Sequence, residues 1–222
     1  MSCPERLPWP KLPEFVRSDL VDVAVSLTVT ESTTVYTGAV WNVQSETFAI
    51  GDETLTRQFI DHTGAVAILA LDDRDRVCLI AQYRHPVRSR EWELPAGLLD
   101  FAGESPLAAA QRELAEEADL VASDWNVLID FQVSPGGSNE ALRVYLARGV
   151  SDADEVFERT GEESEIEKRW VPLDEVVDAV LARNVQNSIL VVAILAAQAG
   201  KARGWSTLAP ADEPWLRHPL SR

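Results

Sequence analysis

Alternating apolar residues early in the chain predict a small β-rich unit. From residue 23 to residue 29, valine or leucine stands at every second position, which is the period of a half-buried strand. Residues 35–43 and the stretch around Phe48 show the same pattern, and we expect short strands over 21–58. Few large apolar side chains are available for a core here, so we expect the unit to pack against a partner.

Denser apolar runs predict the central strands of a second, larger unit. Residues 65–71 and 77–83 are almost continuously apolar, and the turn Asp72-Asp73-Arg74-Asp75 separates them. Further strands are predicted at 127–133, 141–146 and 167–171, and helices at 106–118, 173–181 and 187–202. This order predicts the fold class α/β (α+β), a mixed β-sheet sandwiched between helices plus a small N-terminal antiparallel β-sheet unit.

The same patterns divide the chain into three parts. We expect a β-rich unit at 1–60, the domain with the larger sheet and the helices at 61–208, and a C-terminal tail at 209–222. Four prolines in the first twenty residues are expected to keep that segment irregular. The pattern of the tail indicates no role.

The composition narrows the range of functions. The chain has 222 residues and a formal net charge of -16, which argues against nucleic acid as a partner because polyanions are repelled. Its two cysteines, Cys3 and Cys78, exclude a disulfide framework or a cysteine zinc site. The longest apolar run, 189–197, is shorter than a membrane span, and the proline-rich start lacks a signal-peptide core. We expect a cytoplasmic protein with no membrane partner.

The segment 97–120, GLLDFAGESPLAAAQRELAEEADL, carries the candidate chemistry. In the predicted helix, Glu113, Glu116 and Glu117 lie on one stripe at spacings of three and four residues. Carboxylates so close repel one another, whereas a hard divalent cation such as Mg²⁺ or Mn²⁺ makes their proximity favourable. Arg112 can pair with one of these acids and orient it. The alternative is an acidic helix face that only contacts solvent.

The spacing of these residues resembles the Nudix box. The matching residues are Gly97, Glu104, Arg112-Glu113-Leu114, Glu116-Glu117 and Leu120, with seven residues between Glu104 and Arg112 as in that family. Two features differ from the usual box. Six residues instead of five separate Gly97 from Glu104, which places an extra residue at 101–103, and Asp119 stands where the family usually has glycine. Neither difference removes an acid, and the resemblance implies the Nudix fold.

The flanking residues resemble the ADP-ribose pyrophosphatase branch of this family. They are Gln82-Tyr83-Arg84, Trp92-Glu93-Leu94-Pro95-Ala96-Gly97 and Ser134-Pro135-Gly136-Gly137-Ser138-Asn139-Glu140. Pro135 lies fifteen residues beyond Leu120, and in that branch a proline at this distance accompanies a preference for ADP-ribose. Taken alone, Ser-Pro-Gly-Gly is an ordinary turn. The branch also implies a domain-swapped homodimer that exchanges the N-terminal units, in agreement with their thin predicted core.

The resemblance implies a hydrolase that cleaves the pyrophosphate bond of ADP-ribose to AMP and ribose 5-phosphate. It also implies that the Ala96 carbonyl oxygen and the carboxylates of Glu113 and Glu117 hold Mg²⁺ or Mn²⁺, with Glu116 bridging. Two alternatives stay open. The same fold can cleave another nucleoside diphosphate sugar or a dinucleotide, or it can act as a non-catalytic nucleotide-sugar-binding regulator.

The catalytic base is expected outside the box, whose acids hold the metal. A similar acidic loop supplies the base in this branch, which implies a role for Glu162, with Glu163 and Glu165 as the next choices. The alternative is a solvated run of charges.

Three further residues are expected to contact the substrate. Arg84 offers a planar fork of donors suited to phosphate or ribose oxygens, although a surface cation is the alternative. Glu93 precedes the box as in the branch, and Trp41 can stack on the adenine or serve a structural role.

Overall fold

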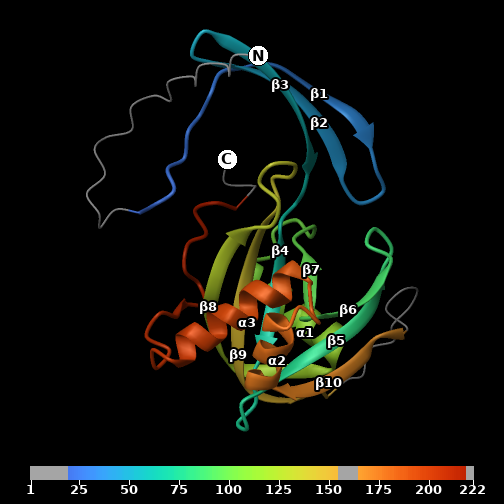
Figure 1. The fold of residues 1–222 in the computed structure, drawn as a ribbon, viewed down its shortest axis with the longest axis vertical. Coiled ribbons are helices and arrows are strands. Elements are labelled where there is room, and N and C mark those ends of the chain that lie inside the picture. Colours follow the sequence, from blue (N-terminus) through green and yellow to red (C-terminus); the bar gives the residue numbers. More distant parts are fainter. Residues whose placement is uncertain (1–19, 155–164, 219–222) are drawn as a thin grey trace. The chain divides into compact units, whose positions relative to one another are not determined.

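The computed structural model describes residues 20–154 and 165–218 (Figure 1). The chain forms two compact units, Met1–Phe59 and Ile60–Arg222, and each is described by itself. Within the described residues, no helix has the length and apolar character that crossing a membrane requires.

The N-terminal unit is a three-stranded sheet in the order β1-β2-β3. Its strands are β1 (Val29–Thr37), β2 (Asn42–Ile50) and β3 (Glu53–Asp61), and β1 pairs antiparallel to β2. Gly51, with φ of 58°, makes the tight turn between β2 and β3. None of the described residues from 20 to 59 is buried, so this sheet has no enclosed core within its own unit.

Two of the predicted N-terminal strands are wrong in position. Only Val29 of the alternating segment 23–29 lies in a strand, although the Thr28 carbonyl oxygen accepts a hydrogen bond from the Ala49 N–H of β2 at 3.2 Å. The segment 35–43 is broken at 38–41 by a turn in which the Gly38 N–H donates to the Trp41 carbonyl oxygen at 3.2 Å. Phe48 lies in β2, as predicted.

The described part of the larger unit, residues 60–154 and 165–218, contains two sheets and three helices. Its strands are β4 (Ala65–Ala70), β5 (Arg76–Arg84), β6 (Ser89–Glu93), β7 (Ala96–Leu98), β8 (Leu120–Gln132), β9 (Ala141–Asp152), β10 (Glu167–Pro172) and β11 (Ala209–Pro210). The helices are α1 (Pro106–Ala118), α2 (Leu173–Leu181) and α3 (Ser188–Lys201). One sheet has the order β11-β8-β9-β4-β7 and the other β10-β5-β6.

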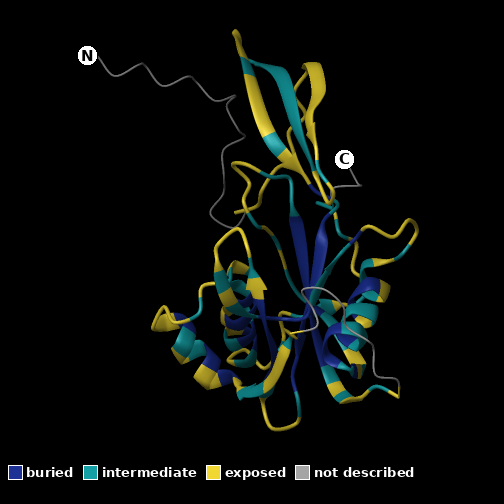
Figure 2. Ribbon diagram, turned by 90° about the vertical axis from the view of Figure 1, so that its right-hand side faces the viewer, coloured by how far each residue is buried: buried dark blue, intermediate teal, exposed yellow. Residues whose placement is uncertain are grey.

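The apolar run of β4 is continuous because both faces of the strand are buried. Ala65, Ala67 and Leu69 join the core that includes residues of α2 and α3, whereas Val66 and Ile68 join the core beneath α1. The buried central strands lie between helices on both sides (Figure 2). This arrangement confirms the predicted fold class, a mixed sheet sandwiched between helices.

Helix α1 begins and ends where its sequence predicts. The hydroxyl oxygen of Ser105 accepts a hydrogen bond from the Ala108 N–H at 3.2 Å, and Pro106 occupies the first helical position. Asp119 ends the helix in the left-handed region at φ 52°, where its N–H donates to the Ala115 carbonyl oxygen. On the inner face of the helix, the side chain of Leu114 is fully buried. An aspartate therefore takes the backbone conformation that the family usually assigns to glycine.

The sheet edges differ most from the sequence-based expectation. Strand β8 begins at Leu120 rather than 127, and the short strands β6, β7 and β11 were not predicted. Strand β11 lies within the segment expected to be a tail, and it pairs with β8. Strands of two to five residues carry too few alternations to be recognised, and their pairing depends on distant neighbours.

Candidate active site

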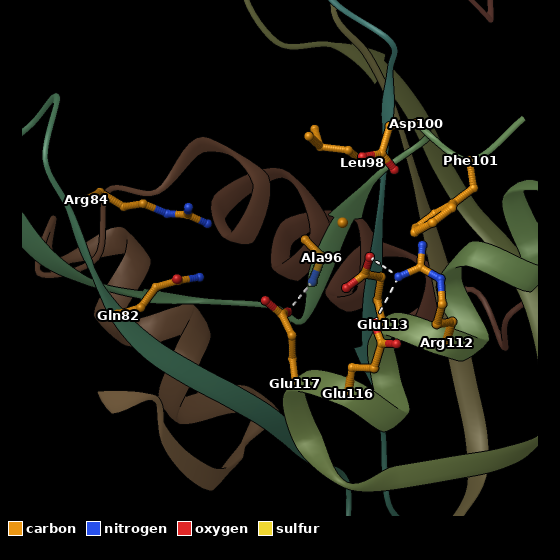
Figure 3. A pocket seen from close by; sticks show the side chains of 11 residues that line it. Gln82, Arg84, Ala96, Leu98, Asp100, Phe101, Arg112, Glu113, Glu116 and Glu117 are labelled. Carbon is orange, nitrogen blue, oxygen red and sulfur yellow. Dashed lines mark hydrogen bonds and ion pairs between the residues drawn. The ribbon is translucent and has the colours of Figure 1, made fainter. Parts of the chain in front are cut away.

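A pocket with a cavity volume of about 420 Å³ lies beside α1 (Figure 3). Strand β5, strand β7, the loop after β7 and helix α1 supply its walls. The lining residues are Gln82, Arg84, Ala96, Gly97, Leu98, Asp100, Phe101, Arg112, Glu113, Glu116 and Glu117. This cavity therefore contains all four predicted metal ligands and one predicted substrate contact, Arg84.

The carboxylate of Glu113 lies directly over the backbone of Gly97. A Cβ built at position 97 would overlap the Glu113 side chain, so only glycine leaves room for this close approach. The folded chain thus gives a steric reason for glycine at position 97, because the carboxylate of Glu113 packs against it.

The guanidinium of Arg112 connects three glutamates. Its Nε and Nη2 donate to the two carboxylate oxygens of Glu104, each at 3.0 Å. Its Nη1 donates to Oε1 of Glu113 at 2.6 Å and to Oε2 of Glu116 at 2.9 Å. Hydrogen bonding to Arg112 lowers the pKa of Glu104, and hydrogen bonding to Glu104, first among several causes, raises the pKa of Arg112. Glu104 and Arg112 are therefore both charged at neutral pH.

Glu117 links α1 to the strand opposite. It is buried, and its Oε2 accepts a hydrogen bond from the Ala96 N–H at 2.8 Å. This contact joins the third helical acid to the first residue of β7, the residue whose carbonyl oxygen was predicted to hold the metal.

Arg84 and Glu93 contact each other. Arg84 Nε donates to Glu93 Oε1 at 2.8 Å, and Nη2 donates to Oε2 at 2.7 Å, a bidentate pair. Gln82 adds a third donor to Glu93 at 3.2 Å. Glu93 is only 3% exposed and does not line the pocket, whereas Arg84 and Gln82 do. Glu93 is thus placed to fix the plane of the Arg84 guanidinium.

The remaining predicted residues lie elsewhere or outside the described part of the chain. Glu162 and Glu163 fall among the undescribed residues 155–164. Glu165 is exposed and outside the pocket lining, and its carbonyl oxygen accepts from Arg90 Nη2 at 3.0 Å. Trp41 belongs to the N-terminal unit and is 44% exposed.

Sequence reasoning assigned no role to several pocket residues. Gln82 precedes Arg84 by two positions on β5, so strand alternation alone places both side chains on one face. Asp100 and Phe101 lie in the loop that is one residue longer than the usual box. That extra length is the sequence feature that could have directed attention to this wall of the pocket, although no role was predicted from it.

The donors of the pocket fit a hard divalent cation. Three carboxylates and the Ala96 backbone present oxygen atoms, which Mg²⁺ and Mn²⁺ prefer. Among the described residues, no three His, Cys, Asp or Glu side chains converge into a complete ion-binding cluster. Arg112 Nη1 donates to Glu113 and Glu116, and the Ala96 N–H donates to Glu117.

The sheet sandwich and the acid-lined pocket define the class of protein as a Nudix-type hydrolase. The NUDIX domain family matches residues 61–192, and the chain belongs to this family. The family prediction is therefore confirmed. Nudix hydrolases generally use divalent metal ions.

Individual relatives support the same family. The chain is 41% identical over 191 residues to an ADP-ribose pyrophosphatase of Mycobacterium tuberculosis, covering 86% of this chain and 91% of the relative. It is 29% identical to a methanol dehydrogenase activator of Bacillus methanolicus, covering 72% of this chain and 86% of that protein. It is 32% identical to a CMP-5'-(N-acetyl-N-hydroxy-3-aminopropyl)phosphonate hydrolase of Streptomyces rubellomurinus, covering 66% and 69%.

A solved structure shares the fold. The crystal structure of an ADP compounds hydrolase superposes with a TM-score of 0.68 at 20% identity, covering 83% of this chain and 99% of that one.

Proposed function

We propose that the protein hydrolyses the pyrophosphate bond of ADP-ribose and releases AMP and ribose 5-phosphate, with Mg²⁺ as the divalent ion. The observation that carries this proposal is the pocket in which Glu113, Glu116 and Glu117 face the Ala96–Leu98 strand. The 41% identical relative, named as an ADP-ribose pyrophosphatase, supports the choice of substrate.

The charge of the pocket supports the requirement for a cation. A diphosphate would be repelled by three carboxylates in a chain of net charge -16. Glu113, Glu116, Glu117 and the Ala96 carbonyl oxygen would hold the ion. When bound, it supplies neutralisation of the negative charge on the diphosphate oxygens.

Arg84 is proposed to bind and orient the substrate. Its bidentate pairing with the buried Glu93 holds the guanidinium plane at the pocket wall, so the side chain loses little further freedom on binding. Glu93 would thus act through Arg84.

A glutamate of the acidic loop is proposed as the general base. Glu162 is the first choice, followed by Glu163 and Glu165. The carboxylate would accept a proton from the attacking water while the oxygen of that water bonds to phosphorus and the bridging P–O bond breaks. The electron pair of that bond leaves on the departing phosphate, so water is divided between the two products.

We propose that residues 1–60 form a dimerisation unit that is exchanged between two copies. The absence of buried residues in the described segment 20–59 supports a partner surface, and Val35, Tyr36 and Trp41 are exposed there. In this dimer Trp41 would stack on the adenine. A monomer of 24.5 kDa by light scattering would contradict this part of the proposal.

One assay tests the central proposal. After treatment with EDTA, the protein is supplied with Mg²⁺ and ADP-ribose in ¹⁸O-labelled water, and the products are identified by mass spectrometry. We expect AMP and ribose 5-phosphate, with the label on one of them. Glu113→Gln and Glu117→Gln should each abolish turnover and leave the thermal unfolding temperature in EDTA unchanged. Near-normal turnover in either variant would reject the assignment.

A second candidate is hydrolysis of a different nucleotide substrate by the same residues. The relative named as a CMP-phosphonate hydrolase favours it, since its identity of 32% shows that similar chains carry other substrate names. Comparing kcat/KM for ADP-ribose, GDP-mannose and NADH decides between the two. A regulator without catalysis, in line with the relative named as an activator, would cleave none of them.

A further inference from the structure

Phe101 lines the pocket and lies against Arg112. The Arg112 guanidinium carbon is 4.7 Å from the centre of the Phe101 ring (Figure 3). The residue is 60% exposed, so burial of apolar surface explains little of its position. A ring at this distance is within the range of a cation–π interaction, which accounts for the contact.

The loop before α1 brings the ring and Glu104 to the same guanidinium. The Glu104 N–H donates to the Phe101 carbonyl oxygen at 3.2 Å, and Gly103 between them has φ of 84°. This turn places Phe101 against the face of Arg112, while Glu104 binds its edge through Nε and Nη2. The longer loop thus contributes two contacts to one cation.

We propose that Phe101 is a positioning residue that, through Arg112, holds Glu113 and Glu116 in the arrangement that binds the divalent ion. This inference rests on the proposed function. With the face covered by the ring and the edge held by Glu104, the guanidinium can rotate little, and Nη1 stays directed at the two carboxylates. Nη1 contacts one oxygen of each carboxylate and so brings the two acids together.

Loss of the ring would let the guanidinium turn away. The carboxylates of Glu113 and Glu116 repel each other when the guanidinium of Arg112 is not between them, so the distance between them would increase. The ion would then have to restore the arrangement on binding, which weakens its affinity. An exposed cation–π interaction corresponds to a change of roughly two- to five-fold in the dissociation constant.

The test measures ion binding directly. Free Mn²⁺ is titrated into metal-free protein and followed by electron paramagnetic resonance, without substrate. Phe101→Leu, which keeps an apolar side chain but removes the ring, should raise the Mn²⁺ dissociation constant by about two- to five-fold. Phe101→Tyr keeps the ring and should bind as the wild type does. An unchanged or tighter Phe101→Leu, or an equally weakened Phe101→Tyr, would overturn the proposal.

Two further variants separate positioning from a general structural effect. In an Arg112→Gln background, Phe101→Leu should cause no additional loss of Mn²⁺ affinity, because the guanidinium that the ring contacts is absent. Arg169→Gln is the matched control, since Arg169 lies at the same 4.7 Å from the Trp92 ring but does not line the pocket. It should leave Mn²⁺ binding unchanged. A full Phe101→Leu effect without Arg112, or a loss in Arg169→Gln, would assign the effect to folding.

The outcome distinguishes this inference from the proposed function. A wild-type protein that binds no Mn²⁺ would contradict both. A wild-type protein that binds Mn²⁺ and loses it in Glu117→Gln, while Phe101→Leu is unaffected, would contradict only the role of Phe101. Unfolding in EDTA confirms that each variant is folded, and the exposed position of Phe101 predicts little change in stability.

Discussion

Replacement of Gly97 by alanine tests whether strand β7 and helix α1 must approach as closely as they do. Gly97 lies in β7, opposite Val66 of β4, and its Cα is covered by the side chain of Glu113. The new methyl group would occupy the space of the Glu113 carboxyl group. The backbone of β7 is paired and cannot retreat, so the flexible Glu113 side chain would move instead.

The expected loss of stability is small because two effects oppose each other. Alanine in place of a strand glycine stabilises by about 0.5–1 kcal/mol. Displacement of Glu113 breaks its charge-assisted hydrogen bond to Arg112, which is worth about 1.5–3 kcal/mol when fully formed. Because the site is partly open to solvent, we expect a net decrease of about 1 kcal/mol in the unfolding free energy.

The expected loss of function is larger. A displaced Glu113 no longer presents its oxygens beside Glu117 and the Ala96 carbonyl group, so kcat/KM for the pyrophosphate substrate should fall at least about tenfold, equivalent to about 1.4 kcal/mol. Urea unfolding and steady-state kinetics at saturating Mg²⁺ measure the two quantities separately.

A double-mutant cycle decides whether steric overlap is the cause. In a Glu113→Ala background the methyl group meets no carboxylate, so Gly97→Ala should no longer destabilise the protein and should instead be neutral or slightly stabilising. If Gly97→Ala keeps near-normal activity, or if it destabilises equally with and without the Glu113 side chain, the steric argument is wrong.

Three other predictions concern the wider domain. Asp130→Ala should lower the unfolding free energy by about 3 kcal/mol in urea, because it leaves Arg143, 2% exposed and bidentate to Asp130, as a buried charge without its carboxylate; a change below about 1 kcal/mol would contradict this. Burial raises the pKa of Cys78 to about 12, so peptide mapping should find it unlabelled by iodoacetamide at pH 8 until urea is added. Hydrogen bonding to Arg112 lowers the pKa of Glu104 in the folded state. The ionised Glu104 therefore stabilises the fold above its ordinary pKa of 4.5, and this contribution is lost as the pH falls through the folded-state pKa. In Glu104→Gln, the unfolding free energy should decrease less steeply as the pH is lowered through this range.

Local patterns were sufficient for helix α1 and for the strand β4. The cap at Ser105, the proline after it and the buried stripe ending at Ala118 are all properties of neighbouring residues. The continuous apolar run of β4 indicated burial on both faces without any knowledge of which helices cover them. The alternation at 23–29 misled because a period of two does not by itself fix where strand pairing begins.

The relation between Arg84 and Glu93 could not be read from the chain. Both were expected to contact substrate, and the structure pairs them with each other across β5 and β6. The register of these two strands decides that contact, and β6 was too short to be predicted. The packing of Phe101 on Arg112 likewise depends on the path of a loop whose length, but not whose conformation, was visible in the sequence.

The helix with three acids on a common stripe was predictable from neighbouring residues alone, and the family followed from the spacing of those residues. The spacing of side chains along a helix is set by its 3.6-residue period, which is local and needs no partner. The pairing of Arg112 with an acid of its own helix is equally local, whereas the approach of the acids to the bare backbone of Gly97 and the N–H of Ala96, and the hold of the loop on Arg112, come from the folded chain. These contacts depend on how β7 and the loop approach α1, and that approach is set by the burial of both cores together.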